Sequence, residues 1–225
     1  MKYYKFELSM LWANIISLVL FVVGIICFNV TYGEYDYPNM VILMLTFIIY
    51  LTMHEIIHGL AFSYFCKNKY NVKYGAMLEK GVFYAMCQER INKKATIISL
   101  LAPTIVLTVI ALIPAYIFRI DLLGLLAIFN LAGAAGDLLM TLFVLRLPND
   151  IKYIDYDSVI GFYLISKHDL SKYKSFYMKY KESGKDSDKL INNSIKTLTI
   201  TKTSWIIIVV LAIITFLFYL INVLI

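Results

Sequence analysis

The stretch IIYLTMHEIIHGLAFSYF, residues 48–65, carries three ionisable side chains near the middle of an otherwise apolar segment. These side chains are His54, Glu55 and His58. A charged side chain at the centre of a bilayer costs at least a few kcal/mol, so ionisable residues at that depth face inward and usually serve a function. We therefore expect this segment to be a membrane helix whose polar groups point into a helix bundle.

The composition is that of an integral membrane protein. Of the 225 residues, 60% are hydrophobic and the mean hydropathy is +0.74, whereas a soluble domain has about 45–50% apolar residues. We predict an all-α polytopic membrane protein with about five transmembrane helices, because several apolar runs reach the ~20 residues that cross a bilayer. These runs cover about 9–30, 40–66, 95–117, 122–147 and 204–225.

The chain divides into three parts by polarity. Residues 1–147 form the predicted membrane core, with four helices, and residues 204–225 form a C-terminal transmembrane helix. Between them, residues 148–203 are polar and form a predicted cytoplasmic segment. Within it, DSVIGFYLI is apolar enough to lie on the membrane or to pack beneath the bundle.

The distribution of basic residues predicts the orientation. The net charge of +6 arises largely from segments beside apolar runs, where lysine and arginine meet anionic lipid headgroups, and it does not suggest nucleic-acid binding. The positive-inside rule places Lys2, Lys5 and the polar segments 67–94 and 148–203 in the cytoplasm. We expect a cytoplasmic N-terminus and an outer C-terminus, in the plasma membrane of a prokaryote.

A short β-hairpin is predicted in the cytoplasmic segment between helices 2 and 3. Two short runs, 72–78 and 82–87, flank Glu79-Lys80-Gly81, and a three-residue connection that ends in glycine is a hairpin signal. An irregular loop is the alternative.

The three cysteines suggest no special chemistry. Cys27, Cys66 and Cys87 form no CxxC pair, and their spacing matches neither a disulfide framework nor a zinc ribbon. We interpret them as ordinary apolar residues.

The segment H-E-I-I-H has the spacing of a zinc site. His54 and His58 are four residues apart, so on a helix they lie one turn apart on the same face. Two imidazoles placed in this way can hold one Zn²⁺, and Glu55 beside them is the candidate general base. The alternative is a pair of buried histidines that make polar contacts between helices.

Two histidines need a third ligand, and Asp137 is the candidate. It is the only charged residue inside the run LLAIFNLAGAAGDLLMTLFVL of the fourth predicted span. His58 lies nine residues before Lys67, and Asp137 lies nine residues before Arg146. At ~1.5 Å per residue both groups lie roughly 13 Å above the cytoplasmic boundary, so they are at the same depth. A structural acid paired with another group is the alternative.

The residues before Asp137 are small, and one is polar. Gly133 to Gly136 let helix backbones approach closely, and Gly59 offers a matching small surface. Asn130 lies two turns before Asp137 on the same face. It is a candidate substrate-binding residue through a carbonyl contact, and equally a residue that orients a helix.

At these residues the sequence resembles the site-2 protease superfamily of intramembrane zinc metalloproteases. HEIIHG in one membrane helix and NLAGAAGD in a later one carry the resemblance, which is strongest over about 48–66 and 126–142. The sequence is more closely similar to the putative zincin peptidases, a family of small membrane proteins. The resemblance implies that His54, His58 and Asp137 bind Zn²⁺ and that Glu55 is the catalytic base.

The same resemblance implies a function. A zinc metalloendopeptidase of this type would hydrolyse peptide bonds of membrane-associated or transmembrane substrates, and its β-element would pair with an unwound substrate. Its partners would be a membrane protein or peptide and the lipid bilayer. The alternative is a zinc-dependent binding or regulatory protein on the same scaffold, without proteolysis.

Overall fold

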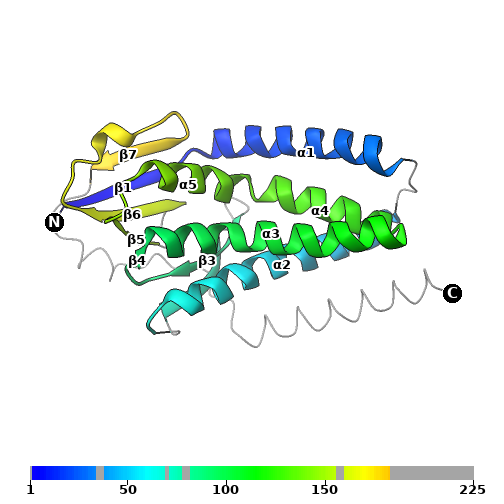
Figure 1. The fold of residues 1–225 in the computed structure, drawn as a ribbon, viewed down its shortest axis with the longest axis horizontal. Coiled ribbons are helices and arrows are strands. Elements are labelled where there is room, and N and C mark those ends of the chain that lie inside the picture. The colour runs from blue at the N-terminus through cyan, green and yellow to red at the C-terminus, as the bar shows by residue number, and fades with distance from the viewer. Residues whose placement is uncertain (1, 34–37, 69–70, 78–81, 156–159, 183–225) are drawn as a thin grey trace.

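The computed structural model describes residues 2–33, 38–68, 71–77, 82–155 and 160–182. Long helices run side by side, and most of the strands gather at the end of the bundle where the chain begins (Figure 1). The helices are α1 (Met10–Tyr32), α2 (Met40–Phe65), α3 (Lys93–Phe118), α4 (Asp121–Gly133) and α5 (Ala135–Arg146). A 3₁₀ helix, η3, covers Ser171–Tyr173.

Three of these helices, α1, α2 and α3, are long and apolar enough to cross a membrane. The pair α4 and α5 passes the same test together as a bent span, which makes four. The protein is therefore a membrane protein whose described part contains three or four candidate spans. The predicted fifth helix, 204–225, lies outside the described residues.

The protein is mostly helical, but the all-α prediction is wrong because five strands form a sheet. These strands are β1 (Lys2–Leu8), β4 (Ile91–Asn92), β5 (Lys152–Ile154), β6 (Gly161–Ser166) and β7 (Met178–Glu182), in the order β4-β5-β6-β1-β7. All neighbours are antiparallel, and β1 pairs with β6 from Lys2↔Ser166 to Glu7↔Gly161. The N-terminal strand therefore lies between two strands from the polar segment.

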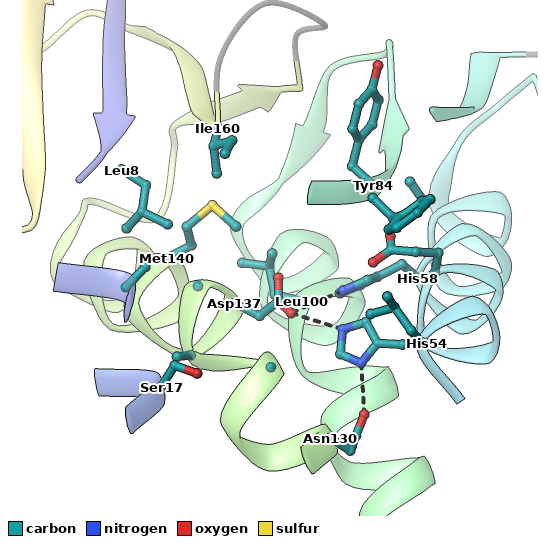
Figure 2. A pocket seen from close by; sticks show the side chains of 18 of the residues that line it. Leu8, Ser17, His54, His58, Tyr84, Leu100, Asn130, Asp137, Met140 and Ile160 are labelled. Atoms are coloured by element: carbon teal, nitrogen blue, oxygen red, sulfur yellow. Dashed lines mark hydrogen bonds and ion pairs between the residues drawn. The ribbon is translucent and has the colours of Figure 1, made fainter. Parts of the chain in front are cut away.

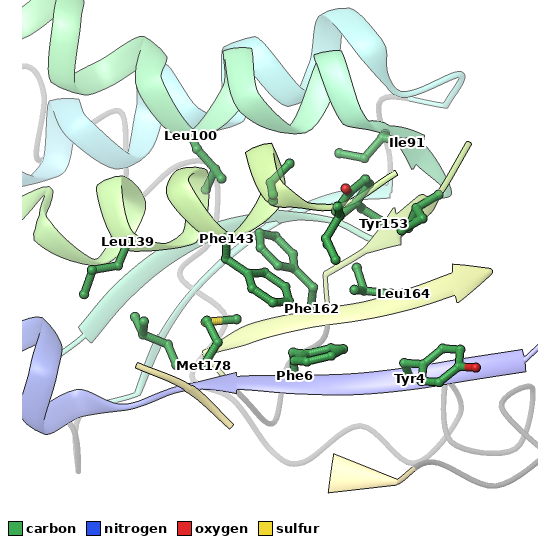
Figure 3. Packing of buried hydrophobic residues seen from close by; sticks show 14 of the residues in the cluster. Tyr4, Phe6, Ile91, Leu100, Leu139, Phe143, Tyr153, Phe162, Leu164 and Met178 are labelled. Atoms are coloured by element: carbon green, nitrogen blue, oxygen red, sulfur yellow. The ribbon is translucent and has the colours of Figure 1, made fainter. Parts of the chain in front are cut away.

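The sheet packs one face against the bundle because its strands alternate in polarity. Tyr4, Phe6 and Leu8 of β1 point inward, and the charged Lys5 and Glu7 lie between them. Figure 3 shows this inner face against α5, where the rings of Phe6 and Phe143 lie 4.7 Å apart between centroids. This packing joins the sheet and the helices in one core.

Within DSVIGFYLI, β6 packs beneath the bundle, which was one of the two expected positions. Phe162 and Leu164 are almost fully buried in the same core as Phe143. Gly161 begins this strand at φ +154°, and a Cβ there would clash with the carbonyl oxygen of Phe6. Glycine is therefore required where β1 and β6 approach most closely.

The predicted hairpin is present as two antiparallel strands, β2 (Val72–Met77) and β3 (Val82–Cys87). Its register runs from Val72↔Cys87 to Met77↔Val82. The connecting residues lie outside the described part, and the cytoplasmic location of the hairpin stays a prediction. Both strands contact α2, which carries the H-E-I-I-H segment.

Candidate metal centre

Helix α2 buries the three polar residues that its sequence singled out. His54, Glu55 and His58 have exposed fractions of only 7%, 6% and 5%. The two histidines lie one turn apart, as the i, i+4 spacing requires, and point to the same side of the helix (Figure 2). The structure therefore places these polar groups inside the bundle and away from lipid.

Asp137 reaches the histidines because the fourth predicted span is broken. The sequence predicted one span over 122–147, but α4 ends at Gly133, α5 begins at Ala135, and their axes differ by 46°. Asp137 lies in the first turn of α5. A carboxylate is favoured there, because the amino end of a helix carries partial positive charge.

The three candidate ligands meet at one point, as Figure 2 shows. The Nε2 atoms of His54 and His58 each lie 3.2 Å from Oδ2 of Asp137, and the candidate ligand atoms of the three residues all lie within 4.8 Å of one another. Two ligands bound about 2.0–2.1 Å from a tetrahedral zinc lie roughly 3.3 Å apart. The separation of each nitrogen from the carboxylate oxygen therefore fits a shared zinc ion.

The hydrogen bonds of the far ring nitrogens also fit a metal. Nδ1 of His58 lies 2.7 Å from the carbonyl oxygen of Ser99. A carbonyl oxygen only accepts, so this nitrogen carries the proton and a neutral ring keeps its lone pair on Nε2. That lone pair faces the Asp137 carboxylate, an arrangement that a cation between them stabilises. Ligating histidines are held through the other ring nitrogen in this way.

The Ser99 carbonyl is free to accept because of a proline one turn later. Pro103 lies inside α3 and has no N–H, so it cannot donate the helical hydrogen bond to Ser99. The sequence interpretation missed both residues. The signal was present, since a proline four residues after Ser99 in an apolar helix leaves one carbonyl without its usual donor.

Pro103→Ala is expected to weaken zinc binding about tenfold. The alanine N–H would compete with His58 for the Ser99 carbonyl, and loss of such an outer contact typically costs 10–100-fold in metal affinity. Zinc affinity measured by competition with a chromophoric chelator checks this. Pro114→Ala, at the other proline inside α3, is the matched control and should leave affinity unchanged. Equal affinities in all three proteins would contradict the role of Pro103.

Asn130 contacts a histidine. Its Oδ1 lies 2.9 Å from Nδ1 of His54, and its Nδ2 donates to Oγ1 of Thr108 at 3.0 Å. Further contacts of 3.3 and 3.4 Å join Nδ2 to the carbonyls of Thr104 and Pro103. These contacts favour the alternative in which Asn130 orients the site. Its predicted contact with substrate stays a prediction.

The hairpin lies directly over α2. The backbone of Ala85 in β3 lies beside the Glu55 carboxylate, and both residues line the same cavity. Tyr74 of β2 packs on Gly59 so closely that a Cβ there would clash with its hydroxyl. The expectation that Gly59 matches the small residues of the fourth span is therefore wrong. Burial raises the pKa of the Tyr74 phenol, so it stays neutral beside Glu55.

Strand β3 is fixed at its far end by a covalent and a polar contact. A disulfide joins Cys66, just after α2, to Cys87, so the interpretation of these two cysteines as ordinary apolar residues is wrong. Cys27 is free. The Cys87 N–H donates to Oδ2 of Asp155 at 3.1 Å, and the Asp155 N–H donates to the Cys87 carbonyl at 3.4 Å. Burial raises the pKa of Asp155 to about 7.

These contacts show which edge of β3 faces the candidate ligands. The backbone of Cys87 bonds to Asp155, and that of Ala85 lies beside Glu55, so the backbone groups of both residues point away from β2. The two-residue period of a strand adds Phe83 to this edge. Among the described strands, β2 is the only partner of β3. Cys87 on this edge is bonded to Asp155, whereas the outward backbone groups of Phe83 and Ala85 have no strand partner in the described part.

A cavity of about 450 Å³ lies beside the candidate ligands. His54, Glu55, His58 and Asp137 line it, and its other walls come from α1, α4, β3 and the start of β6. Its lining is mostly apolar, as is usual for cavities that bind ligands. The polar groups of the site are thus reached through an apolar space.

Comparison with known proteins supports the same chemistry. Residues 47–152 match the sequence model of a family described as putative zincin peptidase. Just under half of the chain is therefore similar to this family. A search of curated proteins and a search of solved structures found no match. The matched residues 47–152 include all three candidate ligands and β3, while α1, β1, β6 and β7 lie outside this range.

Proposed function

We propose that the protein is a membrane-embedded zinc metalloprotease that hydrolyses peptide bonds of membrane-associated or transmembrane substrates. The convergence of His54, His58 and Asp137 on one point, with Glu55 adjoining, carries this proposal. The similarity of residues 47–152 to the zincin family model supports it. Only three protein ligands meet there among the described residues, which leaves a fourth position for water, as in catalytic zinc sites.

Each polar residue has a definite role in this reaction. A bound zinc ion supplies Lewis-acid activation of water and of the peptide carbonyl. Glu55 accepts the proton of the attacking water and passes it to the departing amine. Asn130 and the Ser99 carbonyl hold the two imidazole rings.

The open edge of β3 supplies a binding mode for an extended peptide. A segment laid along this edge would pair with the outward-facing groups of Phe83 and Ala85, next to Glu55. A peptide bond must leave its helix before it can be hydrolysed, and pairing with a strand edge stabilises the extended form. The Cys66–Cys87 disulfide and the Asp155 contacts keep this edge in position.

We further propose that the site lies nearer the cytoplasmic face. Lys67, Lys93 and Arg146 lie at the end of the bundle that carries the five-stranded sheet. The positive-inside rule assigns this end to the cytoplasm.

Metal removal tests the proposed function. The detergent-purified protein is expected to hold about one zinc per chain, in keeping with its single cluster of candidate ligands in the described part. It should also cleave self-quenched fluorescent casein. Treatment with 1,10-phenanthroline should abolish cleavage, and one equivalent of zinc should restore it. Cleavage that resists the chelator would contradict the proposal. Zinc binding without cleavage of casein or of apolar peptides would favour the non-proteolytic alternative.

A further inference from the structure

Helix α1 carries two polar side chains on the face that lines the cavity. Asn14 and Ser17 lie about one turn apart, and both contribute to the cavity wall with Ala13. The other faces of this helix are apolar and exposed, as at Leu18, which is 64% exposed. Figure 2 shows Ser17 across the cavity from His54. Ser17 is half-buried and Asn14 is exposed, and both border the cavity.

Neither side chain has a hydrogen-bond partner among the described residues. On the neighbouring helix α2, the hydroxyls of Thr46, Thr52 and Ser63 each donate to the carbonyl one turn earlier. Ser17 is half-buried, and a half-buried hydroxyl is more stable with a partner. Both side chains are thus available to a polar occupant of the cavity.

The cavity walls define what that occupant is. On the side opposite α1 lie Glu55 and the open edge of β3. At the outer end, Phe129 of α4 bridges the two flanking helices, with ring centroids 5.4 Å from Phe21 of α1 and 5.2 Å from Phe47 of α2. Most of the remaining lining is apolar. An occupant that complements both walls has apolar side chains. It also carries hydrogen-bonding groups along both edges of its main chain.

We propose that Asn14 and Ser17 form a substrate-binding subsite for the main chain of an apolar peptide segment. The inference rests on the proposed function. One edge of the extended segment pairs with β3, and its other edge bonds to the Asn14 amide and the Ser17 hydroxyl. An asparagine amide both donates and accepts, which matches a peptide group. The subsite lies on α1, outside the region that matches the zincin family.

Two hydroxamate probes separate this subsite from the metal. Acetohydroxamate engages only the metal, whereas dileucine hydroxamate adds two apolar side chains and a main chain. In the full-length, zinc-loaded protein, Asn14→Leu and Ser17→Ala are each expected to lower affinity for dileucine hydroxamate five- to tenfold. Acetohydroxamate affinity and zinc content should not change. Asn29→Leu, on the same helix away from the cavity, should affect neither probe.

The outcomes of this experiment are distinct. Unchanged dileucine hydroxamate affinity in both variants would overturn the subsite. An equal loss for both probes would also overturn it, because the substitutions would then act on the metal site. A wild-type protein that binds zinc and neither probe would count against the proposed function.

A second measurement is independent of zinc. In a Cys27→Ser background, Ser17→Cys is expected to react with a charged methanethiosulfonate at least about ten times faster than lipid-facing Leu18→Cys. Dileucine carboxamide, which lacks the metal-binding group, should protect Ser17→Cys. Protection in a protein that fails to bind zinc would support the subsite while the proposed function fails. Reaction without protection would overturn the subsite whether or not zinc binds.

Discussion

Glu55→Gln is expected to lower peptide hydrolysis at least about a thousandfold while zinc stays bound. General-base catalysis contributes typically 10²–10⁴-fold, and an amide cannot take up the proton of the attacking water. Glutamine has nearly the same shape as glutamate, so it should occupy the same position beside Ala85. The measurements are the initial rate of cleavage of fluorescent casein and the zinc content of the same preparation.

Glu7→Gln is the matched control for this variant. Glu7 lies on the outer face of β1 in an ion pair with Lys5, so its substitution should leave the rate of hydrolysis unchanged. If Glu55→Gln cleaved at the wild-type rate, Glu55 would not be the base. If it lost zinc as well, its role would be structural.

Asp137→Ala is expected to weaken zinc binding at least about a hundredfold and to abolish hydrolysis. Loss of a residue that only hydrogen-bonds to a metal ligand typically lowers metal affinity 10–100-fold, so loss of a direct ligand should lower it further. The change also leaves the two imidazoles of His54 and His58 without the carboxylate that both contact. Metal content after gel filtration and competition with a chromophoric chelator measure the effect.

His54→Ala should behave like Asp137→Ala, because both residues would hold the same ion. Asp150→Asn is the control, since that carboxylate is exposed and pairs with His168. Unchanged zinc affinity in Asp137→Ala would show that α5 supplies no ligand to a zinc ion on α2. It would favour the alternative in which the two histidines only make polar contacts. Loss of zinc in Asp150→Asn would show that the preparation is generally unstable.

The site was predictable from the sequence because helix geometry is local. The fixed rise of a helix places His54 and His58 one turn apart, and the charged ends Lys67 and Arg146 mark the depth of both partners. The structure places the candidate ligand atoms of His54, His58 and Asp137 within 4.8 Å of one another, and their role as zinc ligands stays a prediction. The catalytic role of Glu55 and the substrate contact of Asn130 stay predictions.

The bend between α4 and α5 was less accessible to sequence reasoning. The apolar character of the run 122–147 continues across Gly133 and Ala134, so hydropathy alone indicates one span. The small residues permitted a break, but they equally suit close packing of straight helices.

The five-stranded sheet could not be derived from local patterns. The alternation of Tyr4, Phe6 and Leu8 in β1 was a usable signal, hidden by the basic start of the chain and the apolar run that follows. The partner of β1 lies more than 150 residues later, and nothing in either segment specifies that pairing. The disulfide between Cys66 and Cys87 likewise depends on the position of the hairpin on α2.

The central position of β1 has a consequence for the order in which the protein is assembled. A chain is synthesised from its N-terminus, yet its first strand must wait for β6 and β7 before the sheet can close. Until then the cavity wall around Leu8 is incomplete, because Ile160 and Phe162, which line the same cavity, have not yet been made. Both candidate metal-binding helices are complete before that point. The cavity is therefore enclosed late in biosynthesis, after its polar centre exists.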